Sequence, residues 1–266
     1  MNIKTTSKSH LNLLPYSRNE YKGFIRPSLI PWIDSNGLEK LLDKNSAAEI
    51  IKEKPNLIFR IKVRDLKPFS DIVVKKFYHR NFLQFIMSPL KKSKSVRSFT
   101  AAKHLLANGL DTPLPLCVID RRRFGFIKES YYITEYIGKN QKVKHCLLEN
   151  PINEDKVLKL IDLVADYCKS MHGSGMIHRD LNLANFLITK NRLVLVDLNR
   201  SRIRKSIGYF SRVKDIGRLY WRRYRSHFFQ IYAENEKRLY NWKWYFDLYY
   251  IWRKKRRRFK DWLKNI

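Results

Sequence analysis

The spacing of apolar residues changes character about half-way along the chain. Up to about residue 138, short runs of β-branched and aromatic residues predict strands. After residue 153, apolar residues recur every three or four positions, which predicts helices. The order is therefore a strand-rich half followed by a helix-rich half, as in an α+β protein.

In the first half, "NLIFRIKV" (56–63) and "DIVVKKFYH" (71–79) predict a hairpin, and 114–138 predicts two more strands around a basic turn. Helical spacing predicts a helix over 95–110 that ends at Gly109.

The stretch 29–55 also carries helix signals, with Ser35 and Ser46 as possible caps and Pro55 as the end. Residues 1–22 are polar, so we expect a flexible N-terminal segment there.

In the second half, Asn153 is placed to cap a long helix that ends at "GSG" (173–175). Its expected apolar stripe is Leu160, Leu163, Val164, Tyr167 and Met171. Two strand-like runs, 185–188 and 192–198, follow and flank a turn. Beyond about residue 207 the pattern is helical and rich in aromatic and basic residues.

Charge is the unusual feature of the composition. The 266 residues include 55 Lys and Arg against 24 Asp and Glu, a net charge of +31. This excess predicts attraction to a polyanion, whether nucleic acid, anionic lipid or acidic glycan.

The 3 cysteines lie far apart and form no CxxC pair, as expected of free thiols in a reducing compartment. The N-terminus has no apolar core of signal-peptide length, and no window approaches the roughly 20 apolar residues that cross a bilayer. We therefore expect a cytoplasmic protein.

Three polar residues in the middle of the chain point to chemistry. Asp180 follows a helix through a loop, Asn185 comes five residues later, and Asp197 ends the second strand of a predicted hairpin. Phosphoryl transfer needs one carboxylate to receive a hydroxyl proton, and an amide oxygen with a second carboxylate to hold Mg²⁺ against the phosphates. The pattern predicts phosphoryl transfer that depends on Mg²⁺.

These residues carry a resemblance to the protein-kinase-like superfamily. "HRDLNLAN" (178–185) resembles its catalytic loop, and "VDLN" (196–199) stands where its magnesium-binding motif belongs. The resemblance implies Asp180 as the catalytic base, with Asn185 and Asp197 as metal ligands. His178 and Arg179 are expected to brace the loop.

The same resemblance implies a bilobal fold of three parts. After the flexible segment 1–22 comes a small β-rich N-lobe (23–137, a sheet plus one helix), and then a helical C-lobe (138–266) with the basic-aromatic tail.

Further pieces of the resemblance extend across residues 57 to 220. "IVVK" (72–75) resembles the strand that carries the phosphate-binding lysine, which implies Lys75. Lys76 is the alternative, and strand alternation allows only one of the two to enter the cleft. "ITEYIG" (133–138) resembles the hinge, where the backbone of Glu135 and Ile137 would meet adenine. Asp215 in "KDIG" would buttress the catalytic loop.

Within the superfamily, residues 109–137 together with "MHGSGMIHRDLNLANFLI" resemble the bacterial lipopolysaccharide core kinases that act on Kdo or heptose. This resemblance implies ATP and Mg²⁺ as cofactors and phosphorylation of an inner-core sugar hydroxyl on the cytoplasmic side. The substrate would be an anionic glycolipid, which also accounts for the charge.

The sequence departs from the superfamily pattern at several places. No Glu or Asp occurs in 91–110, where a helix would supply the partner of the lysine, and 56–70 holds no glycine to cover the phosphates. Asn182 replaces the lysine usual in Ser/Thr kinases, and the short interval from Asp197 to Asp215 leaves little room for a peptide-docking segment. These departures argue against a protein substrate. They also keep open a pseudokinase that binds a membrane or a partner, and a kinase of another small hydroxylated molecule.

The basic-aromatic tail allows two interpretations. It is a solvated face of packed helices, or it contacts an anionic membrane at the inner face of the cell membrane, with Trp221, Trp252 and Trp262 at headgroup level. Nucleic-acid binding is less favoured, because the tail matches no nucleic-acid-binding signature.

Overall fold

The computed structural model of the chain describes residues 12–63, 66–78, 85–89, 91–148, 153–189, 192–219, 224–234 and 236–262. The chain divides into two compact units. The first unit comprises Met1–Gly138 and Asp197–Asn199, and the second comprises Lys139–Val196 and Arg200–Ile266. The first unit reaches Gly138, one residue beyond the boundary expected between 137 and 138. The grouping of Asp197–Asn199 with the first unit has no counterpart in the sequence pattern.

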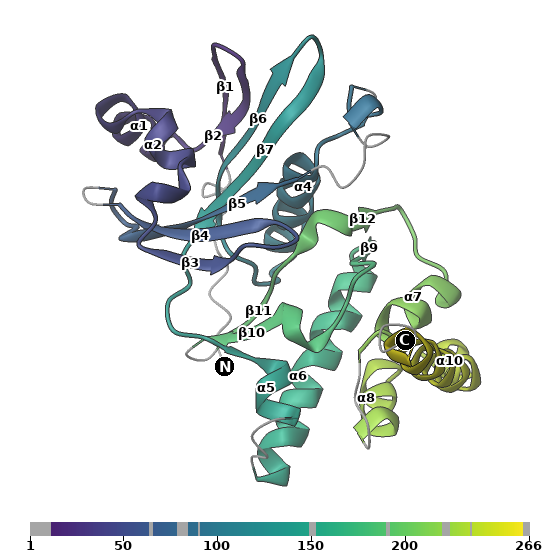
Figure 1. The fold of residues 1–266 in the computed structure, drawn as a ribbon. Helices are drawn as coiled ribbons and strands as arrows, with labels where there is room; N and C mark the ends of the chain where they lie inside the picture. The colour runs from purple at the N-terminus through teal and green to yellow at the C-terminus, as the bar shows by residue number, and fades with distance from the viewer. Residues whose placement is uncertain are drawn as a thin grey trace. The chain divides into compact units, whose positions relative to one another are not determined.

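The first unit is built on one antiparallel sheet of seven strands (Figure 1). From edge to edge these are β1 (Leu14–Arg18), β2 (Tyr21–Ile25), β6 (Pro115–Arg123), β7 (Phe126–Glu135), β5 (Asp71–Phe77), β4 (Leu57–Lys62) and β3 (Glu49–Lys52). The two predicted hairpins, β4–β5 and β6–β7, are confirmed.

Helices α1 (Ile30–Asn36) and α2 (Leu38–Leu42) pack on one face of this sheet. Phe59, Val74 and Ile133 belong to the core that the sheet forms with these helices, and all three are fully buried. Alternation along β5 and β7 sends the side chains at 73, 75, 130 and 132 to the other face.

Helix α4 (Lys94–Ala107) covers that other face and confirms the predicted helix. Its N-cap is Ser93, whose side chain accepts a hydrogen bond from the Val96 N–H at 3.1 Å. The buried Ser95 hydroxyl donates to Asp120 Oδ1 at 2.9 Å and accepts from the Ser130 hydroxyl at 2.8 Å. Polar contacts to β6 and β7 therefore help to fix α4 on the sheet.

Two expectations for the N-terminal region are wrong. Residues 14–22, expected to be loosely ordered, form β1 and the start of β2, because pairing with β6 satisfies the β2 backbone; residues 1–11 lie outside the described residues. The helix expected across 29–55 ends at Leu42, and Ser46 leads into β3 instead of capping a helix. The edge position beside β4 decides this, since it offers hydrogen bonds to 49–52.

The second unit is mainly helical. Its helices are α5 (Val143–Leu148), α6 (Glu154–Gly173), α7 (Tyr209–Ile216), α8 (Arg225–Tyr232), α9 (Lys237–Tyr240) and α10 (Lys243–Trp262). Two small sheets accompany them, β11–β10–β8 (Arg192–Leu195, Phe186–Thr189, Gln141–Lys142) and β12–β9 (Arg202–Ile203, Met176–Ile177). The predicted hairpin of β10 and β11 is confirmed.

The second unit buries the apolar stripe of α6 against aromatic residues of the later helices. Asn153 caps α6 as predicted, since its side chain accepts from the Asp155 N–H at 2.9 Å. Of the expected stripe, Leu163 is wrong: it is 57% exposed, because it lies on the solvent side of the helix. Phe229 of α8 stacks on Phe246 of α10, with ring centroids 4.9 Å apart.

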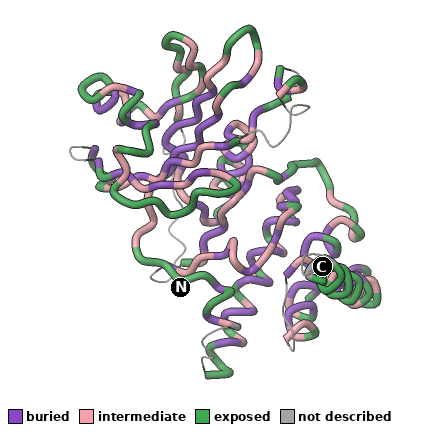
Figure 2. Tube along the Cα trace, viewed as in Figure 1, coloured by how far each residue is buried: buried purple, intermediate pink, exposed green. Residues whose placement is uncertain are grey.

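Most of the surface of α10 is exposed (Figure 2). Trp252 and Trp262 are 48% and 57% exposed, whereas Trp221 lies outside the described residues. Among the helices of the described part of the chain, none is both long enough and apolar enough to span a bilayer.

Candidate active site

Lys75 lies on the face of the sheet that α4 covers. Its Nζ is 2.6 Å from Asp197 Oδ1, and the two side chains are 14% and 36% exposed. Lys76 points to the opposite face and pairs with Glu129. Burial alone would lower the pKa of Lys76, but hydrogen bonds with Glu129 and Tyr131 outweigh burial and raise it. The structure thus brings Lys75, and not Lys76, to Asp197.

Asp197 is held in an uncommon backbone conformation. Its φ is +65°, a region that residues other than glycine rarely occupy. The Asn199 amide donates to its Oδ1 at 2.5 Å. Strain of this kind persists only where surrounding contacts enforce it, and such strain is common at ligand-binding positions.

Helix α4 supplies no acidic partner to Lys75, since residues 94–107 contain no Asp or Glu. The place of that partner is taken by Asp197 itself, 122 residues further along the chain. The departure seen in the sequence is therefore real, and the lysine is oriented by the carboxylate expected to bind metal.

Glu135 is the last residue of β7, and Ile137 follows the end of the strand. The Glu135 N–H donates to the Leu114 carbonyl at 3.0 Å, and its side chain accepts from the Leu114 N–H at 3.1 Å. Of the two backbone groups of Glu135, only the carbonyl could contact adenine.

In the second unit, Asp180 is half-exposed and pairs with a basic residue. Arg200 Nη1 lies 3.2 Å from Asp180 Oδ2, and the Asp180 N–H donates to His178 Nδ1 at 3.3 Å. Arg200 was not among the residues identified from sequence, because no motif marks it. The Asp180 carboxylate is accessible, as a proton acceptor must be.

The side chain of Asn185 is oriented by a hydrogen bond to the backbone of Asp180. Its Nδ2 donates to the Asp180 carbonyl at 3.0 Å, which leaves Oδ1 as the amide atom that can bind a cation. The Val196 N–H donates to the Asn185 carbonyl at 2.9 Å and ties Asn185 to β11.

The donor chemistry fits Mg²⁺. Carboxylate oxygens of Asp197 and the amide oxygen of Asn185 are hard ligands, which Mg²⁺ prefers. Among the described residues, no group of three or more His, Cys, Asp or Glu side chains is placed to hold a metal ion.

The catalytic loop is braced by the buried Asp215 of α7. Its carboxylate accepts from the N–H groups of His178 at 2.7 Å and Arg179 at 2.8 Å. Burial alone would raise the pKa of Asp215, but hydrogen bonding from His172 and the charges of His172 and His178 lower it below the usual value. The buttressing position expected for Asp215 is thus observed.

Behind Asp215 runs a chain of buried polar groups that sequence reasoning missed. His172 Nε2 lies 3.3 Å from Asp215 Oδ2, and His172 Nδ1 lies 2.6 Å from the Tyr232 hydroxyl. Arg212 Nε donates to that hydroxyl at 2.8 Å and both its terminal nitrogens reach Glu236. The only sequence signal was isolated polar residues at buried helical positions.

Comparisons with known proteins show the family and the fold of the chain. The model of the lipopolysaccharide kinase (Kdo/WaaP) family matches residues 52–240. The solved structure "WaaP in complex with acyl carrier protein" is similar with a TM-score of 0.59 at 19% identity, over 85% of this chain and 98% of that one. This likeness shows a protein-kinase-like fold of the α+β class, with a β-sheet N-region and a helical C-region, as predicted.

Two protein kinases are also similar. A mutant form of the Mycobacterium tuberculosis PknI kinase domain has a TM-score of 0.39 at 16% identity, over 57% of this chain and 58% of that one. Mitogen-activated protein kinase hog1 of Blastobotrys adeninivorans is 24% identical over 56% of this chain, which covers about a third (34%) of that protein's length. Because the family model spans well over half of the chain, the protein belongs to the lipopolysaccharide kinase (Kdo/WaaP) family.

Proposed function

We propose that this protein is an ATP- and Mg²⁺-dependent kinase that phosphorylates a sugar hydroxyl, of Kdo or heptose, in the inner core of lipopolysaccharide. One observation carries the proposal: the Lys75–Asp197 ion pair, in a member of this kinase family, joins the residue types that bind nucleotide phosphates and their metal ion.

Each residue has a distinct part in the proposed reaction. Lys75 binds phosphate oxygens, and the backbone at Glu135 and Ile137 binds adenine. Asn185 and Asp197 would hold Mg²⁺, which when bound neutralises the charge that develops on the transferred phosphoryl group. Asp180 orients the acceptor hydroxyl and receives its proton.

Asp215 acts through the backbone. By holding the N–H groups of His178 and Arg179, it fixes the conformation that presents Asp180. Catalysis would then come mostly from positioning and charge neutralisation.

The net charge of +31 supports an anionic glycolipid as acceptor. A protein with such a substrate would work in the cytoplasm, with peripheral contact at the inner face of the membrane. The exposed basic-aromatic surface of α10 suits that contact.

The test is transfer of labelled phosphate from ATP to purified core oligosaccharide and glycolipid, followed by mass spectrometry. We expect Asp180→Ala to reduce turnover by about 100-fold or more while ATP binding and fold remain. Asp166→Asn, a change at an exposed carboxylate of α6, is the matched control and should retain activity. Equal turnover of Asp180→Ala and wild type would refute the role of Asp180.

A second candidate is a pseudokinase that binds a membrane or a partner. It is favoured by the acid-free α4 and by the engagement of Asp197 with Lys75. If calorimetry detects no Mg²⁺-dependent ATP binding at millimolar nucleotide, this candidate replaces the first. A kinase of another small hydroxylated molecule, such as an aminoglycoside, would instead label free acceptors and leave the core unlabelled.

A further inference from the structure

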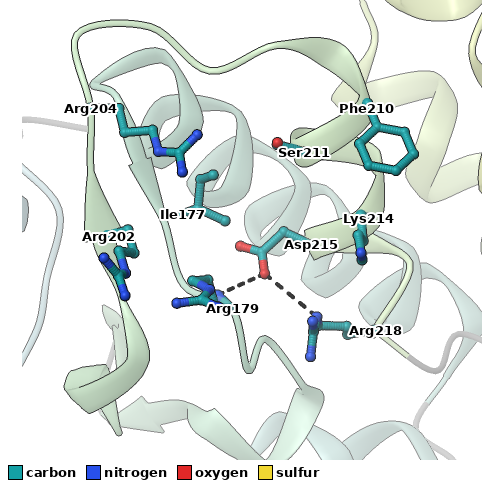
Figure 3. A pocket seen from close by; sticks show the side chains of 9 residues that line it. All are labelled: Ile177, Arg179, Arg202, Arg204, Phe210, Ser211, Lys214, Asp215 and Arg218. Atoms are coloured by element: carbon teal, nitrogen blue, oxygen red, sulfur yellow. Dashed lines mark hydrogen bonds and ion pairs between the residues drawn. The ribbon is translucent and has the colours of Figure 1, made fainter.

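A pocket of about 410 Å³ lies in the second unit, next to the catalytic loop (Figure 3). This volume is typical of a site for a small molecule. Five of the side chains that line it are cationic, and one is a carboxylate. The cations are Arg179, Arg202, Arg204, Lys214 and Arg218, and the carboxylate is Asp215.

Asp215 offsets at most one of these five positive charges, and its oxygens already have other partners. They accept from two backbone N–H groups and face His172 Nε2. Arg218 Nε lies 3.9 Å from Asp215 Oδ1, beyond hydrogen-bond distance, and this buried nitrogen has no hydrogen-bond partner among the described residues. A buried guanidinium nitrogen without a partner is costly, so an anion in the pocket would satisfy it.

The cations converge on the pocket from separate elements. Arg202 and Arg204 are two residues apart along the extended β12 segment and therefore share a side of it. Lys214 and Arg218 come from α7 and the turn after it. Figure 3 shows the two pairs on opposite sides, with Arg179 and Asp215 between them. Like charges gathered around one pocket focus a positive potential there.

The pocket is also built at some conformational cost. Arg179 has φ +64°, and its N–H is held by Asp215. The β12 segment approaches β9 so closely that a Cβ on Gly175 would lie 2.2 Å from the Arg204 carbonyl oxygen. Strained positions of this kind concentrate at binding sites.

We infer that this pocket is an anion site that binds a phosphomonoester group. A phosphomonoester carries close to two negative charges and three acceptor oxygens, which matches several arginine forks better than a single carboxylate does. Under the proposed function, on which this last step rests, the phosphate belongs to the acceptor glycolipid. Arg179 directly precedes Asp180, so the pocket shares a loop with the residue proposed to receive the acceptor's proton.

The inference is tested with full-length protein by calorimetry. The probes are inorganic phosphate, a sugar phosphate, the same sugar without phosphate, and acceptor glycolipid with and without its phosphate groups. Two variants test the pocket. R202Q/R204Q removes the cations on its β12 side, and K214Q removes one on its α7 side. K156Q/K159Q removes two exposed cations of α6 and serves as the matched control.

Wild type should bind the sugar phosphate and not the free sugar. R202Q/R204Q should weaken this binding about tenfold or more, and K214Q should weaken it in the same direction. The control should change it less than twofold, and Mg²⁺·ATP binding should stay unchanged in all three. If the glycolipid supplies the phosphate, removal of its phosphate groups should raise KM for the acceptor.

Absence of binding by wild type, or equal weakening in R202Q/R204Q and the control, would overturn the inference. If the protein binds the sugar phosphate but transfers no phosphoryl group to core acceptors, the proposed function is refuted and the anion site is retained. If both pocket variants transfer phosphate to core acceptors with an unchanged KM for the acceptor, the proposed function is retained and the role of the pocket in acceptor binding is refuted. Circular dichroism of each variant separates loss of binding from loss of fold.

Discussion

Single residues in this protein take their roles from what faces them across the fold. Lys75 and Lys76 are neighbours in sequence, yet one meets Asp197 and the other Glu129, because successive side chains of a strand point to opposite faces. Lys76 forms a partly buried ion pair with Glu129. Under the proposed function, Lys75 exchanges its carboxylate partner for phosphate oxygens.

This difference predicts the effect of substituting each lysine. Lys75→Met should lower kcat/KM for ATP about 100-fold, because a preorganised charge at the phosphates is lost. Lys76→Met should instead lower stability, since Glu129 loses its nearest cation, and should affect kcat/KM far less. Steady-state kinetics and urea unfolding of both variants measure this. A larger kinetic loss in Lys76→Met would show that the assignment is reversed.

Asp215 predicts a dependence of stability on pH. The pKa of Asp215 is lowered in the folded protein, so its ionised form stabilises the fold above the ordinary carboxyl value of 3.8. That contribution is lost as pH falls through the still lower folded pKa. Asp215→Asn should therefore be destabilised by about 2 kcal/mol near neutral pH, and its deficit should shrink below pH 4. Urea unfolding from pH 3 to 7 gives both curves; parallel curves would contradict the shift.

At the scale of elements, β12 lies close beside β9, the strand that leads into the loop expected to be catalytic. The Arg204 N–H donates to the Gly175 carbonyl at 2.8 Å, and Gly175 has φ +87°. Only glycine permits both the positive φ and the approach of the Arg204 carbonyl. The glycine that looked in the sequence like a simple helix stop is thus part of a strand-to-strand contact.

Gly175→Ala should lower the free energy of unfolding by about 2 kcal/mol or more, because the new Cβ both strains the backbone and meets Arg204. Gly173→Ala is the natural control, since a Cβ built there would meet no described atom within 4 Å beyond its chain neighbours and the adjoining backbone of its own helix. Thermal and urea unfolding compare the two. Equal effects in both variants would mean that β12 moves away freely.

At the scale of the whole molecule, the positive charge gathers at more than one place. Some cations face the pocket beside the catalytic loop, while others, such as the exposed Lys254 and Lys255, lie on α10 near Trp252. Basic and aromatic residues on one exposed helix are typical of a surface that contacts anionic lipid headgroups.

Binding to vesicles of phosphatidylglycerol should therefore depend on α10. K254Q/K255Q should lower the affinity for these vesicles, measured by co-sedimentation, by about 2 kcal/mol, roughly 30-fold. Added salt should also lower the affinity of the wild type for the vesicles. K52Q/K54Q removes the same charge from β3 and the residues after it and should have little effect. If both variants lose binding equally, the attraction is a property of net charge and not of α10.

Patterns in the sequence predicted most of the elements and the candidate site residues. Periodicity located three hairpins, α4 and α6, and the motif spacing identified Asp180, Asn185, Asp197 and Lys75 as candidates. It failed at Leu163 and at 29–55, where alternatives of similar local propensity are decided by packing and by an available strand edge.

Only the tertiary structure decided which groups meet. The pairing of Lys75 with a carboxylate 122 residues away, the brace of Asp215 and the polar chain behind it, and the gathering of five cations around one pocket all join segments far apart in sequence. The physical reason is that local periodicity fixes the direction in which a side chain points, whereas its partner depends on how distant segments pack.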